Sequence, residues 1–118
     1  NRLLQSETAT TEGRTVVSNY YEVLNKKDYH GAYRYLSARA MERYGTFELW
    51  EQAMAKDEVH KVKAIQLDYV SQDQDDDIIV NYMGFTVTFE DNLEPLLVRL
   101  HNEGKGWGIV AIEAAEED

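Results

Sequence analysis

The sequence predicts an α+β fold, with helices in its first half and an antiparallel sheet in its second half. Apolar residues recur at helical spacing up to about residue 57, and beyond it they alternate with polar residues as in half-buried strands. Short polar turns separate the alternating stretches, which indicates antiparallel neighbours. We therefore expect N-terminal helices packed on one face of a curved, mainly antiparallel four-stranded sheet.

Four short helices are expected before residue 57. Thr10 or Thr11 is the expected N-cap of the first, and Asp28, Ser37 and Thr46 are the expected N-caps of the next three. With 118 residues the chain fits one domain. We expect residues 1–10 to be a polar lead or linker, 11–114 to be a single cone-like domain, and 115–118 to be an acidic tail.

The expected strands cover 65–69, 78–89 and 96–101, and the last strand begins at Trp107. In the second of these the apolar positions shift by one between Tyr82 and Phe85. A strand that changes faces needs an extra residue, so we expect Gly84 to form a β-bulge that curves the sheet. A curved sheet that wraps a helix leaves a concave mouth, where pockets are common.

The composition excludes several classes of function. The net charge is −10 without any basic cluster, which disfavours nucleic acid and anionic membrane surfaces as partners. The absence of Cys removes disulfides, thiolate nucleophiles and Cys-based zinc sites. No apolar run approaches the ~20 residues of a membrane span, so direct membrane insertion is not expected. A small apolar ligand or a protein partner remains, and we expect no cofactor.

Metal binding is not expected either. Asp73, Asp75 and Asp77 match the first three ligands of a calcium loop. The match then fails, because Ile78 occupies the position that needs Gly and Gly84 the position that needs a bidentate Glu. We interpret the segment as a solvated hairpin turn.

Two stretches of the chain resemble the nuclear transport factor 2-like superfamily, to which ketosteroid isomerases and SnoaL-like cyclases belong. Residues 16–33 (VVSNYYEVLNKKDYHGAY) resemble its opening helix, its ALN-x-x-D turn and its second helix, and residues 104–109 (GKGWGI) resemble its G-x-W-x-I final strand. The resemblance implies a cone-shaped α+β fold and is closest to small exported or lipoprotein-type members of unknown function. It also implies an extracytoplasmic location, secreted or anchored through a segment upstream of this one.

The same resemblance suggests where catalysis would reside. Tyr20 lies near the Tyr that donates to a developing oxyanion in the isomerases, but Arg43 and Tyr44 stand where their carboxylate base is expected. Asp68 and His101 are the remaining acid–base candidates, although alternation along their strands points both toward solvent. For all three candidates we favour a structural or solvent-exposed role over catalysis.

An apolar ligand pocket would be lined by six aromatic residues, and the same residues could fill the core instead, which we favour. They are Tyr20, Tyr33, Trp50, Tyr82, Phe85 and Trp107.

The first functional hypothesis is a non-enzymatic, extracytoplasmic interaction or small-ligand-binding domain. The second is a SnoaL-like or isomerase-like enzyme for a hydrophobic small molecule, with Tyr20 as donor and Asp68 or His101 moving the proton. The third is an accessory domain of a larger cell-envelope protein. A homodimer is also expected, formed through an open sheet face on which Leu97 and Val110 are exposed.

Overall fold

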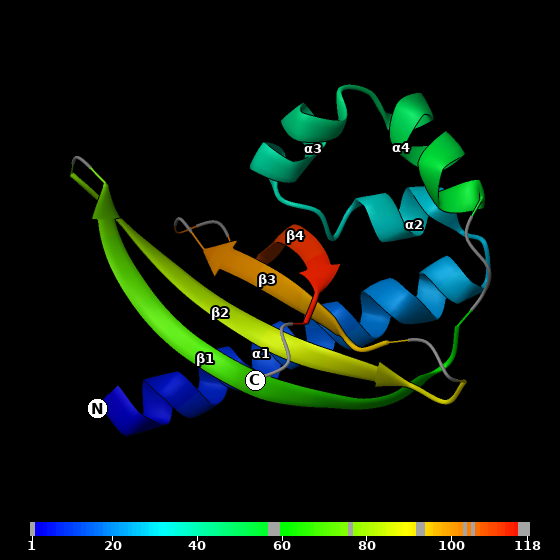
Figure 1. The fold of residues 1–118 in the computed structure, drawn as a ribbon. Helices are drawn as coiled ribbons and strands as arrows, with labels where there is room; N and C mark the ends of the chain where they lie inside the picture. The colour runs from blue at the N-terminus through cyan, green and yellow to red at the C-terminus, as the bar shows by residue number, and fades with distance from the viewer. Residues whose placement is uncertain are drawn as a thin grey trace.

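The computed structural model describes residues 2–56, 60–75, 77–91, 94–102, 104 and 106–115, with the backbone alone for 2–8 and 75. Within these residues, helices precede strands along the chain, and the curved sheet lies beside α1 with the shorter helices gathered at one end (Figure 1). The helices are α1 (Arg2–Asn25), α2 (Tyr29–Tyr33), α3 (Ala38–Tyr44) and α4 (Phe47–Ala55). The strands are β1 (Val62–Asp75), β2 (Ile78–Phe89), β3 (Leu96–Asn102) and β4 (Gly108–Ala114). The predicted α+β fold is confirmed.

The sheet has the order β1-β2-β3-β4, and every neighbouring pair is antiparallel. β1 and β2 are much longer than β3, whose pairing with β2 begins only at Asn81. The hairpin of β1 and β2 therefore continues past β3 as a two-stranded ribbon, which we call the arm (residues 70–75 and 77–80). The arm projects from the body of the molecule on the left of Figure 1.

The bulge lies in a different strand from the one predicted. β2 is continuous, and Gly84 pairs regularly with Tyr69 and Arg99. The register shift occurs in β1 between Leu67 and Tyr69, which makes Asp68 the extra residue. The apparent change of phase in β2 reflects two apolar rows on opposite faces of one strand.

α1 is longer than predicted, because it already begins at Arg2. Thr10 and Thr11 lie inside it and do not cap it, so the predicted start of the first helix was wrong. The helix continues because it has a surface to pack against: Ala9 contacts the core, and Gly13 lies so close to the Met83 side chain that a Cβ there would overlap it. At its other end, Asn25 Nδ2 donates to the carbonyl of His60 at 2.7 Å.

The three predicted caps of the short helices are confirmed. The side chain of Asp28 accepts from the amide of Gly31, Ser37 Oγ from that of Ala40, and Thr46 Oγ1 from that of Leu49, at 3.0, 3.2 and 3.2 Å. Each cap satisfies one of the amides that the first turn of a helix leaves without a partner.

Helices α2 to α4 form a helical cap at one end of the sheet. Trp50 is fully buried at its centre, and the rings of Tyr29, Tyr33 and Phe47 surround it with centroid distances of 6.4, 5.1 and 6.0 Å. The chain just before α3 joins β4, because the amide of Ser37 donates to Ile109 and the amide of Ile109 donates to Tyr35. The β4 edge of the sheet is thus bonded at Ile109 to the backbone that leads into α3.

Candidate functional site

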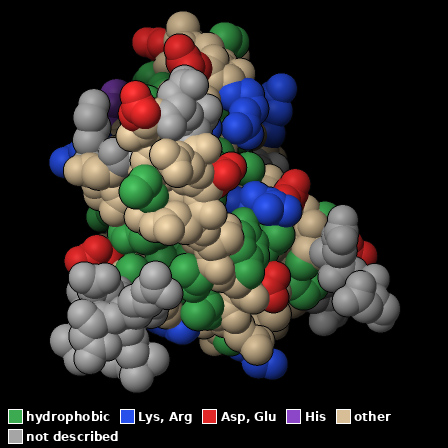
Figure 2. All heavy atoms as spheres, turned by 90° about the vertical axis from the view of Figure 1, so that its left-hand side faces the viewer, with side chains coloured by type: hydrophobic (Ala, Val, Ile, Leu, Met, Phe, Trp, Pro, Cys, Tyr) green, Lys and Arg blue, Asp and Glu red, His purple; other side chains and the backbone are tan. Residues whose placement is uncertain are grey.

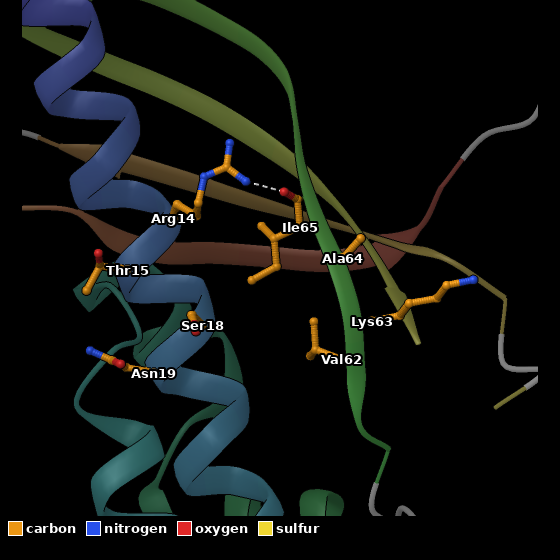
Figure 3. A pocket seen from close by; sticks show the side chains of 8 residues that line it. All are labelled: Arg14, Thr15, Ser18, Asn19, Val62, Lys63, Ala64 and Ile65. Atoms are coloured by element: carbon orange, nitrogen blue, oxygen red, sulfur yellow. Dashed lines mark hydrogen bonds between the residues drawn. The ribbon is translucent and has the colours of Figure 1, made fainter. Parts of the chain in front are cut away.

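An open groove of about 460 Å³ separates α1 from β1, the other edge strand of the sheet (Figure 3). Pockets of this size are typical of small-ligand and peptide sites, although this one is a surface groove rather than an enclosed cavity. Four residues of α1 and four of β1 line it: Arg14, Thr15, Ser18, Asn19, Val62, Lys63, Ala64 and Ile65.

The β1 wall owes its shape to a second register shift. Between Val62 and Ala64 the pairing with β2 skips Lys63, which is the extra residue. Val62 and Ile65 consequently both point toward α1, while the side chains of Lys63 and Ala64 point away from it (Figure 3). An apolar patch therefore forms on the β1 side of the groove.

The α1 wall is polar, and Arg14 dominates it. Arg14 reaches from α1 to β1 and donates through Nη1 to the carbonyl oxygen of Ile65, whereas Thr15 and Asn19 point away from the strand (Figure 3). The guanidinium carbon of Arg14 also lies 5.6 Å from the ring centroid of Phe85. A guanidinium has five N–H donors, so donation to one carbonyl leaves it able to bind a further carbonyl or carboxylate.

The two edges of the sheet therefore differ. Two backbone hydrogen bonds join residues 35–37 to Ile109 on the β4 edge, but at the groove the β1 edge receives a side chain, Arg14, at one carbonyl. An edge strand next to open space presents backbone donors and acceptors to any further strand. This edge was not identified from the sequence, because β1 and α1 are far apart along the chain and no motif marks either wall.

The six aromatic residues predicted to line a pocket are not part of the groove. Tyr20, Trp50 and Phe85 are at most 1 % exposed and belong to the packed core. Tyr33 and Trp107 are half-buried against that core. Tyr82 lies on the opposite face of β2 from Phe85, where its ring is 6.2 Å from that of His101. Among the described residues, these side chains pack against their neighbours and do not line a cavity.

The three catalytic candidates are not brought together. Tyr20 is in the core, with its hydroxyl 3.9 Å from Met54 Sδ. Asp68 is exposed, as predicted. His101 is only 6 % exposed, so its predicted exposure was wrong. It does lie on the opposite face of β3 from Leu100, where its cross-strand neighbour is Tyr82 of β2.

The open face of the sheet also differs from the prediction. Leu97 is 9 % exposed and Val110 is half-buried, so the two do not form the exposed apolar patch expected at a dimer interface. Polar and aromatic side chains occupy this face instead. Arg99 donates to the Tyr69 hydroxyl at 3.0 Å and also to the Glu113 carboxylate, and this hydrogen bond to Glu113 raises the pKa of Arg99.

Metal-ligating side chains do not converge within the described residues, where no group of three or more His, Asp or Glu is placed to hold an ion. His60 instead lies 2.5 Å from an Asp91 carboxylate oxygen, and the ring of His30 stacks on Phe47 at 4.1 Å. In the segment from Asp73 to Asp77, which was interpreted as a solvated hairpin turn, the Asp75 side chain lies outside the described residues.

Comparisons with family models, with curated proteins and with solved structures found no match to this chain. None of the helices in the described part of the chain combines the length and the apolar character that crossing a membrane requires.

Proposed function

We propose that this chain is a non-enzymatic binding domain that holds an extended polypeptide segment along the open edge of β1, in the groove beside α1. The observation that carries the proposal is the difference between the two sheet edges. The β4 edge is held at Ile109 by two backbone hydrogen bonds from residues 35–37, whereas the β1 edge borders a groove where Arg14 holds a single carbonyl.

Strand addition is the binding mode that suits such an edge. An added strand takes its affinity from main-chain hydrogen bonds and its specificity from pockets for alternate side chains. The stretch from Val62 to Ile65 spans about 13 Å at 3.3 Å per residue, which suits a segment of about four residues. Displacing Arg14 from the Ile65 carbonyl would release that acceptor to the incoming strand.

The groove also suggests the chemistry of the segment. Val62 and Ile65 favour an apolar side chain at one position, and Arg14 favours a carboxylate close by. Lys63 adds a second positive charge at the same edge of an otherwise strongly acidic chain. We therefore propose a segment that pairs an apolar residue with Asp or Glu.

The nuclear transport factor 2-like cone forms part of this proposal as its scaffold. The order of four helices and a four-stranded antiparallel meander supports it. The filled interior, with Tyr20, Trp50 and Phe85 fully packed, favours a surface interaction over a ligand inside the cone.

The test is selection of peptides from a random library on the purified domain, followed by hydrogen exchange of the complex. We expect selected peptides to slow amide exchange in the Val62–Ile65 stretch. Ser18→Trp fills the groove from its α1 wall and should abolish binding. Glu12→Trp places the same bulk at an exposed position of α1 outside the groove and should leave binding intact.

Two results would contradict the proposal. One is selected peptides whose binding is the same in the Ser18→Trp variant. The other is a small molecule that copurifies with the domain, seen as extra mass in native mass spectrometry and still bound in that variant. The second result would favour a ligand in the interior.

A further inference from the structure

The groove borders only the first part of the β1 edge. Its β1 wall ends at Ile65, whereas β1 continues to Asp75 and remains the edge strand of the sheet. From Val62 to Gln74 every residue of β1 is exposed or half-buried. The edge that the groove opens therefore runs on toward the arm.

The backbone of β1 directs a regular series of groups toward this open side. In an antiparallel pair, alternate residues turn both their N–H and their C=O away from the partner strand. Ile65 is one such residue, because its carbonyl accepts from a side chain of α1. Gln74 is another, because its amide donates to the carboxylate of the preceding residue at 2.9 Å. Between these two, the pairing with β2 gives the same orientation to Leu67, Val70 and Gln72.

The bulge at Asp68 does not interrupt the series. From Leu67 to Val70 the β1 chain takes three steps, while β2 takes two, from Phe85 to Met83. A strand added on the outer side of β1 would match the same stretch with two steps, as β2 does. One continuous strand can therefore follow β1 past the bulge, and Asp68 is exposed beside it.

The charge along this edge has one sign. Figure 2 looks onto the side from which the arm projects in Figure 1, and acidic, basic and hydrophobic side chains are all exposed there. The two strands of the edge are simpler, because residues 66–88 contain five Asp and no Lys or Arg. Residues 2–13 of α1, which reach Met83 of β2 through Gly13, add two Glu and one Arg. Together the two ranges have seven acidic side chains and one basic side chain.

Arg99 does not change this balance. It is the one basic residue in β2, β3 and β4, and it reaches β1 by donating to the Tyr69 hydroxyl at 3.0 Å. It also donates to the Glu113 carboxylate, which offsets its charge. The edge beyond Ile65 therefore favours a partner with positive charge.

We propose that the segment held in the groove continues as a fifth strand along β1 as far as Gln72, and that this continuation is basic. Its Lys or Arg side chains lie beside Asp68 and Asp73. The added strand ends near Gln72, because the amide of Gln74 is already bonded to Asp73. This fifth strand rests on the proposed function, since the groove must hold its first part.

The whole site suits a segment of about nine residues. β2 matches the stretch from Val62 to Gln72 with the nine residues from Asn81 to Phe89, and an added strand needs a similar number. The part in the groove lies beside Arg14 and Lys63, which favour an acidic side chain. The segment is therefore acidic at one end and basic at the other.

Hydrogen exchange of the complex, followed residue by residue by NMR, tests the length of the added strand. The probe is a set of peptides selected from a random library on the purified domain. Their binding should slow exchange of the outward amides of Leu67, Val70 and Gln72 as well as that of Ile65. The selected sequences should combine an acidic residue in one half with Lys or Arg in the other.

Charge reversal tests the chemistry. The edge-reversed variant, Asp68→Lys with Asp73→Lys, has a net charge of −10 + 4 = −6. It should bind the selected peptides about tenfold more weakly or worse, because like charges then face each other. Peptides in which Glu replaces Lys and Arg should recover binding to this variant, a result that damage to the arm would not give.

The matched control changes the same net charge elsewhere. Glu42→Lys with Glu48→Lys also gives −10 + 4 = −6, and both positions are exposed in the helical cap. This variant should bind the selected peptides as the unmodified chain does. Equal loss of binding in the control would mean that only overall charge matters, and would overturn the proposal.

Three further results would overturn it. Peptides that protect Ile65 but not Leu67, Val70 or Gln72 would leave the groove proposal standing and remove the fifth strand. A domain that selects no peptide would contradict both proposals. A dimer of the unmodified chain that protects the same amides without added peptide would mean that a second copy, rather than a separate basic segment, covers the edge.

Discussion

Tyr21 shows what a single buried hydroxyl does to this core. Its ring packs edge-on against Tyr20 and Phe89, with centroid distances of 5.1 and 5.6 Å. The side chain is 7 % exposed, and its hydroxyl has no hydrogen-bond partner among the described residues. Burial raises the pKa of the Tyr21 hydroxyl above its ordinary value, because the phenolate would lose its hydration.

We predict that the free energy of unfolding falls as the pH rises above about 10, partly through this residue. The unfolded chain releases the Tyr21 proton there, while the folded chain retains it, so alkali favours the unfolded state. In the Tyr21→Phe variant, the free energy of unfolding, measured by urea denaturation at a series of pH values, should fall less steeply with pH above about 10. At pH 7 it should leave stability unchanged or raise it by up to about 1 kcal/mol, because it removes a buried polar group without a partner.

Tyr44→Phe, at an exposed position, is the control. Its free energy of unfolding should fall with rising pH as steeply as that of the unmodified chain. A Tyr21→Phe variant that loses more than about 1 kcal/mol at pH 7 would mean that the hydroxyl has a stabilising partner in the folded state.

At the scale of elements, the four strands are tied together on the open face of the sheet. Tyr69 of β1 covers Gly84 of β2, and Arg99 of β3 lies against the Tyr69 ring, with its guanidinium carbon 5.7 Å from the ring centroid. Arg99 also binds Glu113 of β4. Gly84 is required in this arrangement because a Cβ there would overlap the tyrosine ring.

We predict that Gly84→Ala lowers the free energy of unfolding by about 1–3 kcal/mol, the usual cost of forcing an extra carbon into a packed site. Tyr69→Ala should remove the clash. The double variant should therefore be more stable than the sum of the two single losses implies, with a coupling of about 0.5–3 kcal/mol in a urea-denaturation cycle. Additive losses would show that the strain at Gly84 has another source.

For the molecule as a whole, the question is whether the helical cap and the sheet unfold together as one cooperative unit, and Trp50 at the centre of the cap is the residue that tests it. The cap joins β4 through the backbone around Ser37 and Ile109, and its own interior is centred on Trp50. Without that ring the cap would lose its largest fully buried side chain.

We predict that Trp50→Ala destabilises the entire domain by about 3–5 kcal/mol. Unfolding followed by far-UV circular dichroism and by tyrosine fluorescence should give coincident transitions, as expected of one cooperative unit. Gln52→Ala, at an exposed position of the same helix, should stay within about 0.5 kcal/mol of the unmodified chain. Two separate transitions in the tryptophan variant would mean that the cap folds independently of the sheet.

Several features were predictable from the sequence because they depend on near neighbours. Helical and strand periodicity located the elements, and Asp28, Ser37 and Thr46 marked helix starts because an N-cap bonds an amide only a few residues away. Short turns implied the antiparallel order of the strands. The filled aromatic core was also preferred over a pocket, and Tyr20, Trp50 and Phe85 are indeed fully packed.

Other features were decided only when distant segments met. Alternation tells which residues share a face of a strand, but not what covers that face, so it could not show that His101 is buried. A bulge is defined by the partner strand, and this is why the extra residue is Asp68 rather than Gly84. The groove between Arg14 and Ile65 exists because the fold places α1 beside an edge strand that no other strand covers, and such adjacency depends on tertiary packing rather than on local pattern.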